Sequence, residues 1–312
     1  MEPFKEKLIT QCNKLDFEHI LNHPNILIAA RFWEEERYQA AMTCYKLMRN
    51  IDDLVDNYKS EHKNLSPEEK KKLMDKVNVW LSTIEREASD IPLVQEVSQV
   101  FKTFGIPVWT MRTFAQSMIY DIKHDGFASL QTFLNYAEGA SVAPAAIFVH
   151  LAGLRKDSSG YKMPLFDIGE AARSCAIFSY LVHIIRDFVK DQQNNLVYYA
   201  DDMMLKYGLT RPMLKDMANG KPIRKGFRDM MSEYCILADQ YRIKTFGILQ
   251  QIKPLVQLQS QLSLDIIFNL YLMVFERIDC NKGNFSSKEL NPGAHEIKQR
   301  VLETIEHFEP CL

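Results

Sequence analysis

The most informative segment of this 312-residue chain is YKLMRNIDDLVD, at residues 45–56. On an α-helix, where each residue advances about 100°, four of its polar side chains share a strip about 60° wide. They are Tyr45, Arg49, Asp52 and Asp56. Apolar residues lie on one side of this strip, so two carboxylates stand one turn apart at the edge of a buried face. Like charges at this spacing repel each other, and either a divalent cation or exposure to solvent must compensate.

A second segment, YLVHIIRDFVKDQQ at residues 180–193, has the same arrangement. Its polar strip carries Tyr180, His183, Asp187 and Asp191, and an apolar strip runs beside it. Two such segments predict helices that face each other across a cavity, with four carboxylates and no local excess of basic residues. Oxygen ligands favour Mg²⁺, which proteins hold with one or two carboxylates together with substrate phosphates and water. Mg²⁺ and diphosphate beside an apolar interior indicate an enzyme that acts on isoprenoid diphosphates.

The remaining sequence favours helices throughout. Apolar residues make up 46% of the chain, whereas Gly and Pro number only 12 each, too few for the turns of a large all-β fold. Ser66 and Asp167 are typical helix N-caps, and the helix after Asp167 should run to about residue 192. No stretch alternates with period two. We expect one all-α domain over residues 1–312, with helices near residues 28–58 (broken near 33–34), 93–104, 108–122, 129–153, 210–218, 225–252, 258–277 and 293–308.

Charge and composition exclude several classes of protein. The 38 Lys and Arg against 40 Asp and Glu give a net charge of −2, without the basic surplus of a nucleic-acid partner. The six cysteines form no CxxC pair and no zinc spacing, as expected for reduced thiols in the cytoplasm. The N-terminus lacks a signal region, and no stretch reaches the roughly 18 apolar residues of a transmembrane segment. Peripheral membrane contact, for example during product release, stays open.

The two motifs together resemble the squalene/phytoene synthase family of head-to-head prenyltransferases. In that family Tyr and Arg precede a first Asp-rich motif, and a second RDxxxD motif is often followed by QQ, as at residues 186–193. Residues 135–143 resemble the family's helix of small residues, residues 196–202 resemble the segment after the second motif, and Tyr271 stands where the family has a tyrosine on its last core helix. The resemblance covers roughly residues 20–280. It implies a class I isoprenoid synthase helical bundle around a central apolar cavity.

The resemblance also implies a reaction. Two prenyl diphosphates, farnesyl or geranylgeranyl, would condense head to head through a cyclopropyl diphosphate to a squalene- or phytoene-type product. NADPH would be needed only if that product is squalene. The expected Mg²⁺ ligands are Asp52, Asp56, Asp187 and Asp191.

The remaining site residues follow from the same resemblance. Arg49 and Arg186 are expected to bind diphosphate, unless each only pairs with a neighbouring Asp on its helix. Tyr45 and Tyr271 are expected to stabilise cations or steer proton removal, unless they are ordinary core aromatics. The other candidates for substrate binding are Tyr136, His183 and Asn25.

The sequence departs from the family's pattern at three places. Residues 22–26, NHPNI, lack the serines that usually bind diphosphate in the family. Either His23 or Asn25 takes over that role, or the segment is a simple loop. His183 stands in place of the usual Asn. Because its nitrogen is a poorer Mg²⁺ ligand than oxygen, we expect His183 either to donate a hydrogen bond to diphosphate or to form a structural hydrogen bond with a neighbouring side chain. Leu196 stands where many members have Arg.

Two other functions stay open on the sequence alone. Residues 52–56 read DDLVD, which also fits other class I enzymes such as head-to-tail prenyltransferases and terpene cyclases. A non-catalytic assembly factor on the same fold is the third candidate, although such relatives lose acidic residues that this chain keeps. The RDxxxD–QQ motif favours the head-to-head reaction. The sequence does not fix the prenyl chain length or the oligomeric state.

Overall fold

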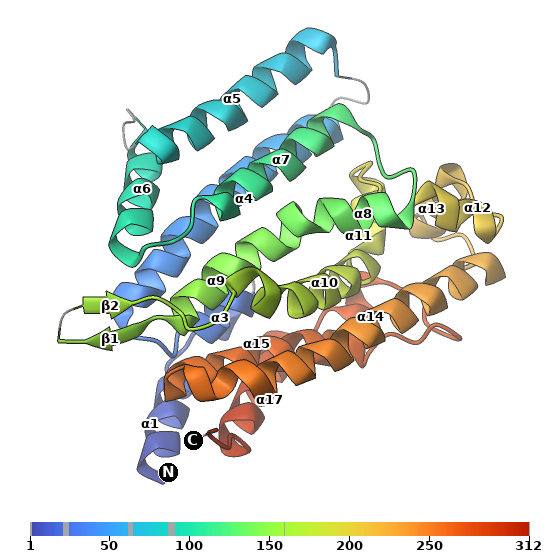
Figure 1. The fold of residues 1–312 in the computed structure, drawn as a ribbon. Helices are drawn as coiled ribbons and strands as arrows, with labels where there is room; N and C mark the ends of the chain where they lie inside the picture. The colour runs from blue at the N-terminus through green and yellow to red at the C-terminus, as the bar shows by residue number, and fades with distance from the viewer. Residues whose placement is uncertain (1, 21–24, 62–64, 87–90, 159, 312) are drawn as a thin grey trace.

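The computed structural model of the chain describes residues 2–20, 25–61, 65–86, 91–158 and 160–311. Helices dominate them, as the all-α prediction requires (Figure 1). The α-helices are α1 (Glu2–Asn13), α2 (Phe17–Ile20), α3 (Asn25–Ala30), α4 (Glu35–Glu61), α5 (Pro67–Arg86), α6 (Pro92–Phe104), α7 (Trp109–Lys123), α8 (Leu130–Ala137), α9 (Ala143–Gly153), α10 (Ile168–Arg186), α11 (Phe188–Gln193), α12 (Asp201–Lys206), α13 (Arg211–Ala218), α14 (Lys225–Ile252), α15 (Leu258–Phe275), α16 (Ser287–Leu290) and α17 (Ala294–Glu306). Shorter elements are the π-helix η1 (Glu138–Val142), the 3₁₀-helix η2 (Lys253–Leu255) and the strands β1 (Arg155–Asp157) and β2 (Gly160–Lys162).

Hydrogen bonds explain why helices begin where the sequence predicts. At the start of α5, the Ser66 amide donates to Glu69 Oε2 at 2.8 Å and the Glu69 amide donates to Ser66 Oγ at 3.3 Å, a complete capping box. At the start of α10, the Glu170 amide donates to Asp167 Oδ1 at 2.9 Å. The predicted break near residues 33–34 is also present, because α3 ends at Ala30 and α4 begins at Glu35.

Three local features differ from the sequence prediction. The helix expected to run from Asp167 to about residue 192 is interrupted at Asp187, whose φ of −93° and ψ of 8° end α10 before α11 begins. The helix expected over residues 129–153 contains the π-helix η1, in which Gly139 lies against Ser117 of α7. The antiparallel hairpin β1–β2 was not predicted, because its mostly exposed residues show no alternation of apolar and polar side chains.

The helix α10 lies at the centre of the bundle. It packs against α14, α9, α15 and η1, whereas α4 packs against α6, α7 and α9. Figure 1 shows α10 between the α8–α9 layer and the α14–α15 layer, with α5 on the outer edge beyond α7. The helices that carry the two acidic motifs therefore enclose an interior that α9, α14 and α15 also border.

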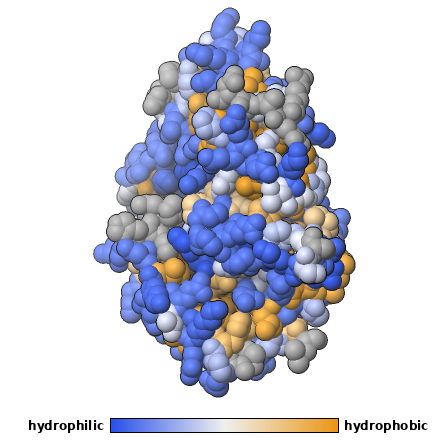
Figure 2. Space-filling model, turned by 90° about the vertical axis from the view of Figure 1, so that its left-hand side faces the viewer, coloured by the Kyte–Doolittle hydropathy of each residue, from blue (hydrophilic) through white to orange (hydrophobic). Residues whose placement is uncertain are grey.

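Two helices, α10 and α15, have the length and apolar composition of a membrane span. In the apolar windows of α10 and α15, 56% and 67% of the residues are buried inside the protein, as expected for central core helices. The face on the hairpin side is mostly hydrophilic, with apolar patches between the polar areas (Figure 2). Met163 and Leu165, which follow β2, are among the exposed large apolar residues.

Candidate active site

A cavity of about 500 Å³ lies between the helices of the two motifs. Its lining includes four carboxylates, here named the acidic cluster: Asp52, Asp56, Asp187 and Asp191. Apolar side chains of α9, α14 and α15, such as Leu151, Leu249 and Leu264, line the rest and are buried. The acidic cluster is only partly buried, so it forms the polar end of the cavity nearer to solvent. The predicted meeting of the two motifs at one cavity is confirmed.

The first motif lies on α4, where Arg49 contacts two carboxylates of its own helix. Its guanidinium is 2.7 Å from Asp53 Oδ1 and 3.5 Å from Asp52 Oδ2. The structure thus contains the intrahelical pair that was the alternative to a diphosphate-binding role. Arg49 also lines the cavity and is about half exposed, which leaves its guanidinium accessible to an anion.

The second motif lies at the break between α10 and α11. Arg186 donates two hydrogen bonds to Asp187, at 2.8 Å and 2.7 Å. Burial opposes the ionisation of Asp187, but these bonds outweigh it and hold the pKa of Asp187 below its usual value. The side chain of Arg186 is not among those that line the cavity, so its predicted contact with diphosphate requires the guanidinium to move towards the cavity.

The other three members of the acidic cluster have raised pKa values. Burial and neighbouring carboxylates raise the pKa of Asp52 to about 6 and that of Asp56 to about 8. Burial and the charge of Asp187 raise the pKa of Asp191 to about 7. Desolvation is the largest cause of each shift, and the charges of neighbouring carboxylates add to it.

The chemistry of this donor set fits Mg²⁺. All four side chains of the acidic cluster offer oxygen, the ligand that Mg²⁺ prefers. Within the described part of the chain, no three His, Cys, Asp or Glu side chains are close enough to hold one metal ion together. The arrangement therefore suits ions that take one or two carboxylates each and complete their coordination with substrate oxygens and water.

One carboxylate beside the acidic cluster was missed by the sequence analysis. Asp121 of α7 is only 7% exposed, and its charge adds to the shifts of Asp52 and Asp56. Lys59 Nζ donates to its Oδ1 at 3.2 Å, and the Tyr136 hydroxyl donates to its Oδ2. The signal was present in the sequence, because Asp121 lies on the apolar face of a helix, where a carboxylate needs partners.

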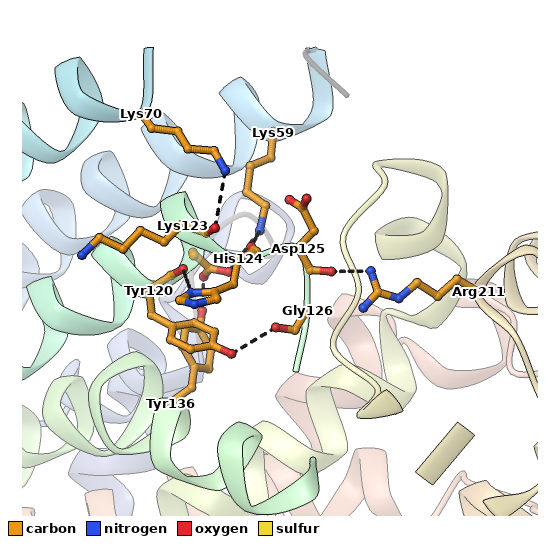
Figure 3. A network of polar contacts seen from close by, with 10 residues as sticks. Lys59, Lys70, Tyr120, Lys123, His124, Asp125, Gly126, Tyr136 and Arg211 are labelled. Carbon is orange, nitrogen blue, oxygen red and sulfur yellow. Dashed lines mark hydrogen bonds and ion pairs between the residues drawn. The ribbon is translucent and has the colours of Figure 1, made fainter. Parts of the chain in front are cut away.

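Lys59 and Tyr136 belong to a wider network around the loop that follows α7 (Figure 3). Lys59 Nζ also donates to the His124 carbonyl at 3.3 Å, and the Tyr120 hydroxyl donates to the Gly126 carbonyl at 3.1 Å. Arg211 of α13 donates to the Asp125 carbonyl at 2.6 Å. Side chains from α4, α7 and α13 therefore hold this loop beside the acidic cluster.

The predicted aromatic residues line the cavity. Tyr45, Tyr136 and Tyr271 all belong to its wall. Burial raises the pKa of Tyr136 and of Tyr271 above the usual value of a phenol. These side chains are therefore neutral, and they offer ring faces and hydroxyl groups rather than phenolates.

His183 also lies on the cavity wall, as predicted from its spacing to Asp187. Its ring meets Tyr271 edge to face, with 5.0 Å between ring centroids, and no described residue hydrogen-bonds to its nitrogens. Burial, with Arg186 nearby, lowers the pKa of His183 to about 3, so the imidazole is neutral. Among the described residues, therefore, no side chain makes the hydrogen bond that a structural role for His183 would require.

Asn25 does not line the cavity, although Ile26 and Leu27, which follow it on α3, do. Residues 22–24, including His23, lie outside the described residues. Leu196 lines the cavity and is buried, so this part of the wall is apolar where the family often has a cation. Of the predicted site residues, Asn25 and Arg186 are the two that the cavity wall does not include.

Comparison with known proteins identifies the family. The sequence profile of the family described as squalene/phytoene synthase matches residues 23–295. No curated protein matches the chain. Its fold resembles a dehydrosqualene synthase in complex with ligand (TM-score 0.69, 16% identity, 97% of each chain covered).

Two further solved structures share the fold. One is squalene synthase HpnC from Alicyclobacillus acidocaldarius (TM-score 0.61, 11% identity, 85% of this chain and 92% of that chain). The other is YisP from Bacillus subtilis subsp. subtilis strain 168 (TM-score 0.58, 17% identity, 95% of this chain and 97% of that chain). Identity this low shows a common fold only, whereas the profile match spans most of the sequence. The chain belongs to the squalene/phytoene synthase family.

Proposed function

We propose that this protein is a Mg²⁺-dependent enzyme that condenses two prenyl diphosphates head to head, through a cyclopropyl diphosphate, to a squalene- or phytoene-type product. One observation carries the proposal: two i, i+4 carboxylate pairs from distant parts of the chain line the same apolar cavity. Membership of the squalene/phytoene synthase family supports the reaction class. Product analysis distinguishes a C15 from a C20 prenyl chain and shows whether NADPH is needed.

In this proposal the acidic cluster holds Mg²⁺, which supplies Lewis-acid stabilisation as diphosphate departs. Arg49 and Arg186 donate to diphosphate oxygens, a role for which the planar guanidinium is suited. The neutral ring of His183 donates one N–H to the same group. Buried apolar side chains of α9, α14 and α15 exclude water from the allylic cation, which water would otherwise capture.

The aromatic wall completes the proposed site. Tyr45 and Tyr271 present ring faces that stabilise carbocations by cation–π attraction. Tyr136 also lies in the cavity wall, and its hydroxyl group donates to Asp121 Oδ2. We propose that it contacts the substrate. Asn25 precedes the cavity-lining residues Ile26 and Leu27 on α3, and we propose that it contacts diphosphate from there.

A further part of the proposal concerns location. We place the enzyme in the cytoplasm, with peripheral contact to a membrane for release of an apolar product. Ile236, Ile243 and Phe246 of α14 are each more than half exposed, whereas Thr245 and Leu249 of the same helix line the cavity. Co-sedimentation with vesicles, compared with a Phe246→Ser variant, tests this: equal binding by the two proteins argues against contact through α14.

The deciding experiment is product analysis. The protein is incubated with farnesyl or geranylgeranyl diphosphate and Mg²⁺, with and without NADPH, and the lipid product is identified by mass spectrometry. Asp52→Ala and Asp187→Ala should each lower turnover by orders of magnitude without unfolding the protein. Asp75→Ala, an exposed aspartate on α5 outside the cavity, is the matched control and should keep full activity. Full activity of either cluster variant, or unchanged activity in EDTA, contradicts the metal assignment. A cyclic or head-to-tail product contradicts the reaction class.

A further inference from the structure

Two of the six cysteines meet outside the wall of the candidate active-site cavity. Cys235 lies in the middle of α14, and Cys280 lies in the turn after α15. Their Sγ atoms are 3.3 Å apart and share a hydrogen bond. A disulfide has an S–S distance of about 2.05 Å, so the sulfurs need to approach by only about 1.3 Å to form a bond.

The turn that carries Cys280 is already held against α14. Arg228, two turns before Cys235 on α14, donates to the Gly283 carbonyl at 2.9 Å and to the Cys280 carbonyl at 3.4 Å. These bonds fix the backbone of the turn at Cys280 and three residues after it. A bond between the two thiols would therefore strengthen an existing contact and would not require the turn to move to a new place.

The pair is chemically asymmetric. The hydrogen bond between the two thiols lowers the pKa of Cys280, against the opposing effect of burial, and the Ser232 side chain and the charge of Arg228 act in the same direction. Arg228 also donates to the Cys280 carbonyl, so its guanidinium lies beside this cysteine. Because the thiolate is the reactive form of cysteine, the cation beside Cys280 makes it the nucleophile of the pair and Cys235 the resolving thiol.

The pair is also accessible to a small reagent. Both side chains are partly exposed and line a surface pocket of about 660 Å³, together with Asp239, Arg242 and Phe275. By contrast, Cys12 and Cys44 are buried, and Cys175 faces the cavity of the candidate active site. Geometry, thiolate character and access therefore coincide at this one pair among the described cysteines.

We propose that Cys235 and Cys280 are a redox modification site, at which a low-molecular-weight disulfide such as oxidised glutathione reversibly forms an intramolecular disulfide. The Cys280 thiolate attacks one sulfur of the reagent, forms a mixed disulfide and releases one glutathione thiolate. The Cys235 thiol loses its proton to that thiolate and attacks Cys280 Sγ, which releases the second glutathione. Two protein thiols are oxidised, one glutathione disulfide is reduced, and the two protons end on the two glutathione thiols.

The new bond ties α14 to the end of α15, two helices that form one wall of the cavity. It closes a long loop of the chain and so restricts the unfolded state. For a chain of this size, we expect oxidation to raise the melting temperature by roughly 4–8 °C. The proposal does not rest on the enzymatic function, and its test uses no substrate.

The experiment titrates the native full-length protein with oxidised glutathione. We expect loss of two alkylatable thiols, a mass lower by two hydrogens, a peptide that joins Cys235 to Cys280, the rise in melting temperature, and full reversal by dithiothreitol. Free Cys235 and Cys280 thiols after prolonged excess of the reagent, a disulfide between other cysteines, or an unchanged melting temperature would overturn the proposal.

Single variants test the assigned roles. Cys235→Ser should stop at the mixed disulfide, so that Cys280 carries one glutathionyl group. Cys280→Ser should leave Cys235 at least tenfold slower to react, because the thiol beside the Arg228 guanidinium has been removed. Cys311→Ser, which changes another partly exposed cysteine, is the matched control and should oxidise as the natural chain does. If Cys280→Ser reacts as fast as the natural chain, the assignment of the nucleophile is wrong.

Discussion

The pair of Lys59 and Asp121 offers a direct test of what holds the acidic side of the cavity together. It joins α4, which carries the first motif, to α7 across a distance of 3.2 Å between Nζ and Oδ1. The two side chains are only 12% and 10% exposed, so solvent and salt screen their attraction weakly. At an effective dielectric constant of about 20, unit charges at this distance attract by about 5 kcal/mol before desolvation is subtracted.

Three variants resolve the net contribution of the pair: Lys59→Met, Asp121→Asn and the double variant. Removal of one partner of a buried pair leaves the other charge unpaired, and Lys59→Met should lower the free energy of unfolding by roughly 3–5 kcal/mol. Asp121→Asn should cost less, about 1–3 kcal/mol, because its amide oxygen still accepts from Tyr136 and the repulsion with Asp52 and Asp56 is relieved. The double variant should lose less than the sum, with a coupling of about 1–3 kcal/mol.

The assay is urea unfolding followed by circular dichroism. The matched control is the exposed pair of Lys225 and Asp229 on α14, whose atoms are 2.6 Å apart but whose Lys225 side chain is 88% exposed. The same cycle there should give a coupling of only about 0.3–0.5 kcal/mol. If the coupling of Lys59 to Asp121 is no larger than this control, burial does not strengthen the pair and the reasoning fails.

Three other predictions follow from single side chains. Gly139→Ala should destabilise the protein by about 1–3 kcal/mol, because the added methyl group meets Ser117 Oγ and the Thr113 carbonyl; an unchanged urea midpoint contradicts this. His183→Asn should alter the Mg²⁺ dependence while keeping substantial activity, and His183→Leu should raise KM; steady-state kinetics that show neither effect exclude a role in diphosphate binding. Burial lowers the pKa of His150 below its usual value near 6.5. The imidazole therefore binds a proton more tightly in the unfolded chain than in the folded protein, and stability falls as the pH drops below about 6.5. His150→Gln should flatten that decline between pH 7 and 5, and an identical pH profile would count against the assignment.

The sequence predicted what depends on local spacing. The i, i+4 carboxylates and the capping box at Ser66 involve residues within one or two turns, and helical geometry alone places them. The break at Asp187 was not predicted, because neither glycine nor proline marks it. Backbone hydrogen bonds also continue on both sides of it: the Asp187 amide donates to the His183 carbonyl and the Asp191 amide donates to the Asp187 carbonyl, each at 2.8 Å. The short hairpin β1–β2 carries no buried face that would impose alternation on its sequence.

Contacts between distant residues explain most of what sequence reasoning missed. Asp121 meets Lys59 across 62 residues, and Cys280 meets Cys235 across 45. No local sequence pattern predicts such a pair, because each partner looks like an ordinary residue of its own helix or turn. Only the tertiary fold brings the two side chains together. An isolated carboxylate on an apolar helix face does predict that a partner exists, but not which one.

The two predicted diphosphate ligands differ in what holds them. Arg49 is 49% exposed, and an exposed ion pair contributes only about 0–1 kcal/mol, so Arg49 can turn from Asp53 to an anion at little cost. Arg186 makes two hydrogen bonds to Asp187, and these side chains are 21% and 24% exposed, so the same turn costs more. Because Asp187 is also an expected metal ligand, Arg186 and Mg²⁺ compete for one carboxylate. If Mg²⁺ takes Asp187, Arg186 would lose its two hydrogen bonds to that carboxylate and be freed for diphosphate, so the two ligands should bind cooperatively. Calorimetry with inorganic pyrophosphate measures this cooperativity. Mg²⁺ should tighten pyrophosphate binding much more in the natural chain than in the Asp187→Asn variant, where Arg186 is held only weakly. If Mg²⁺ tightens pyrophosphate binding equally in both proteins, the linkage is refuted.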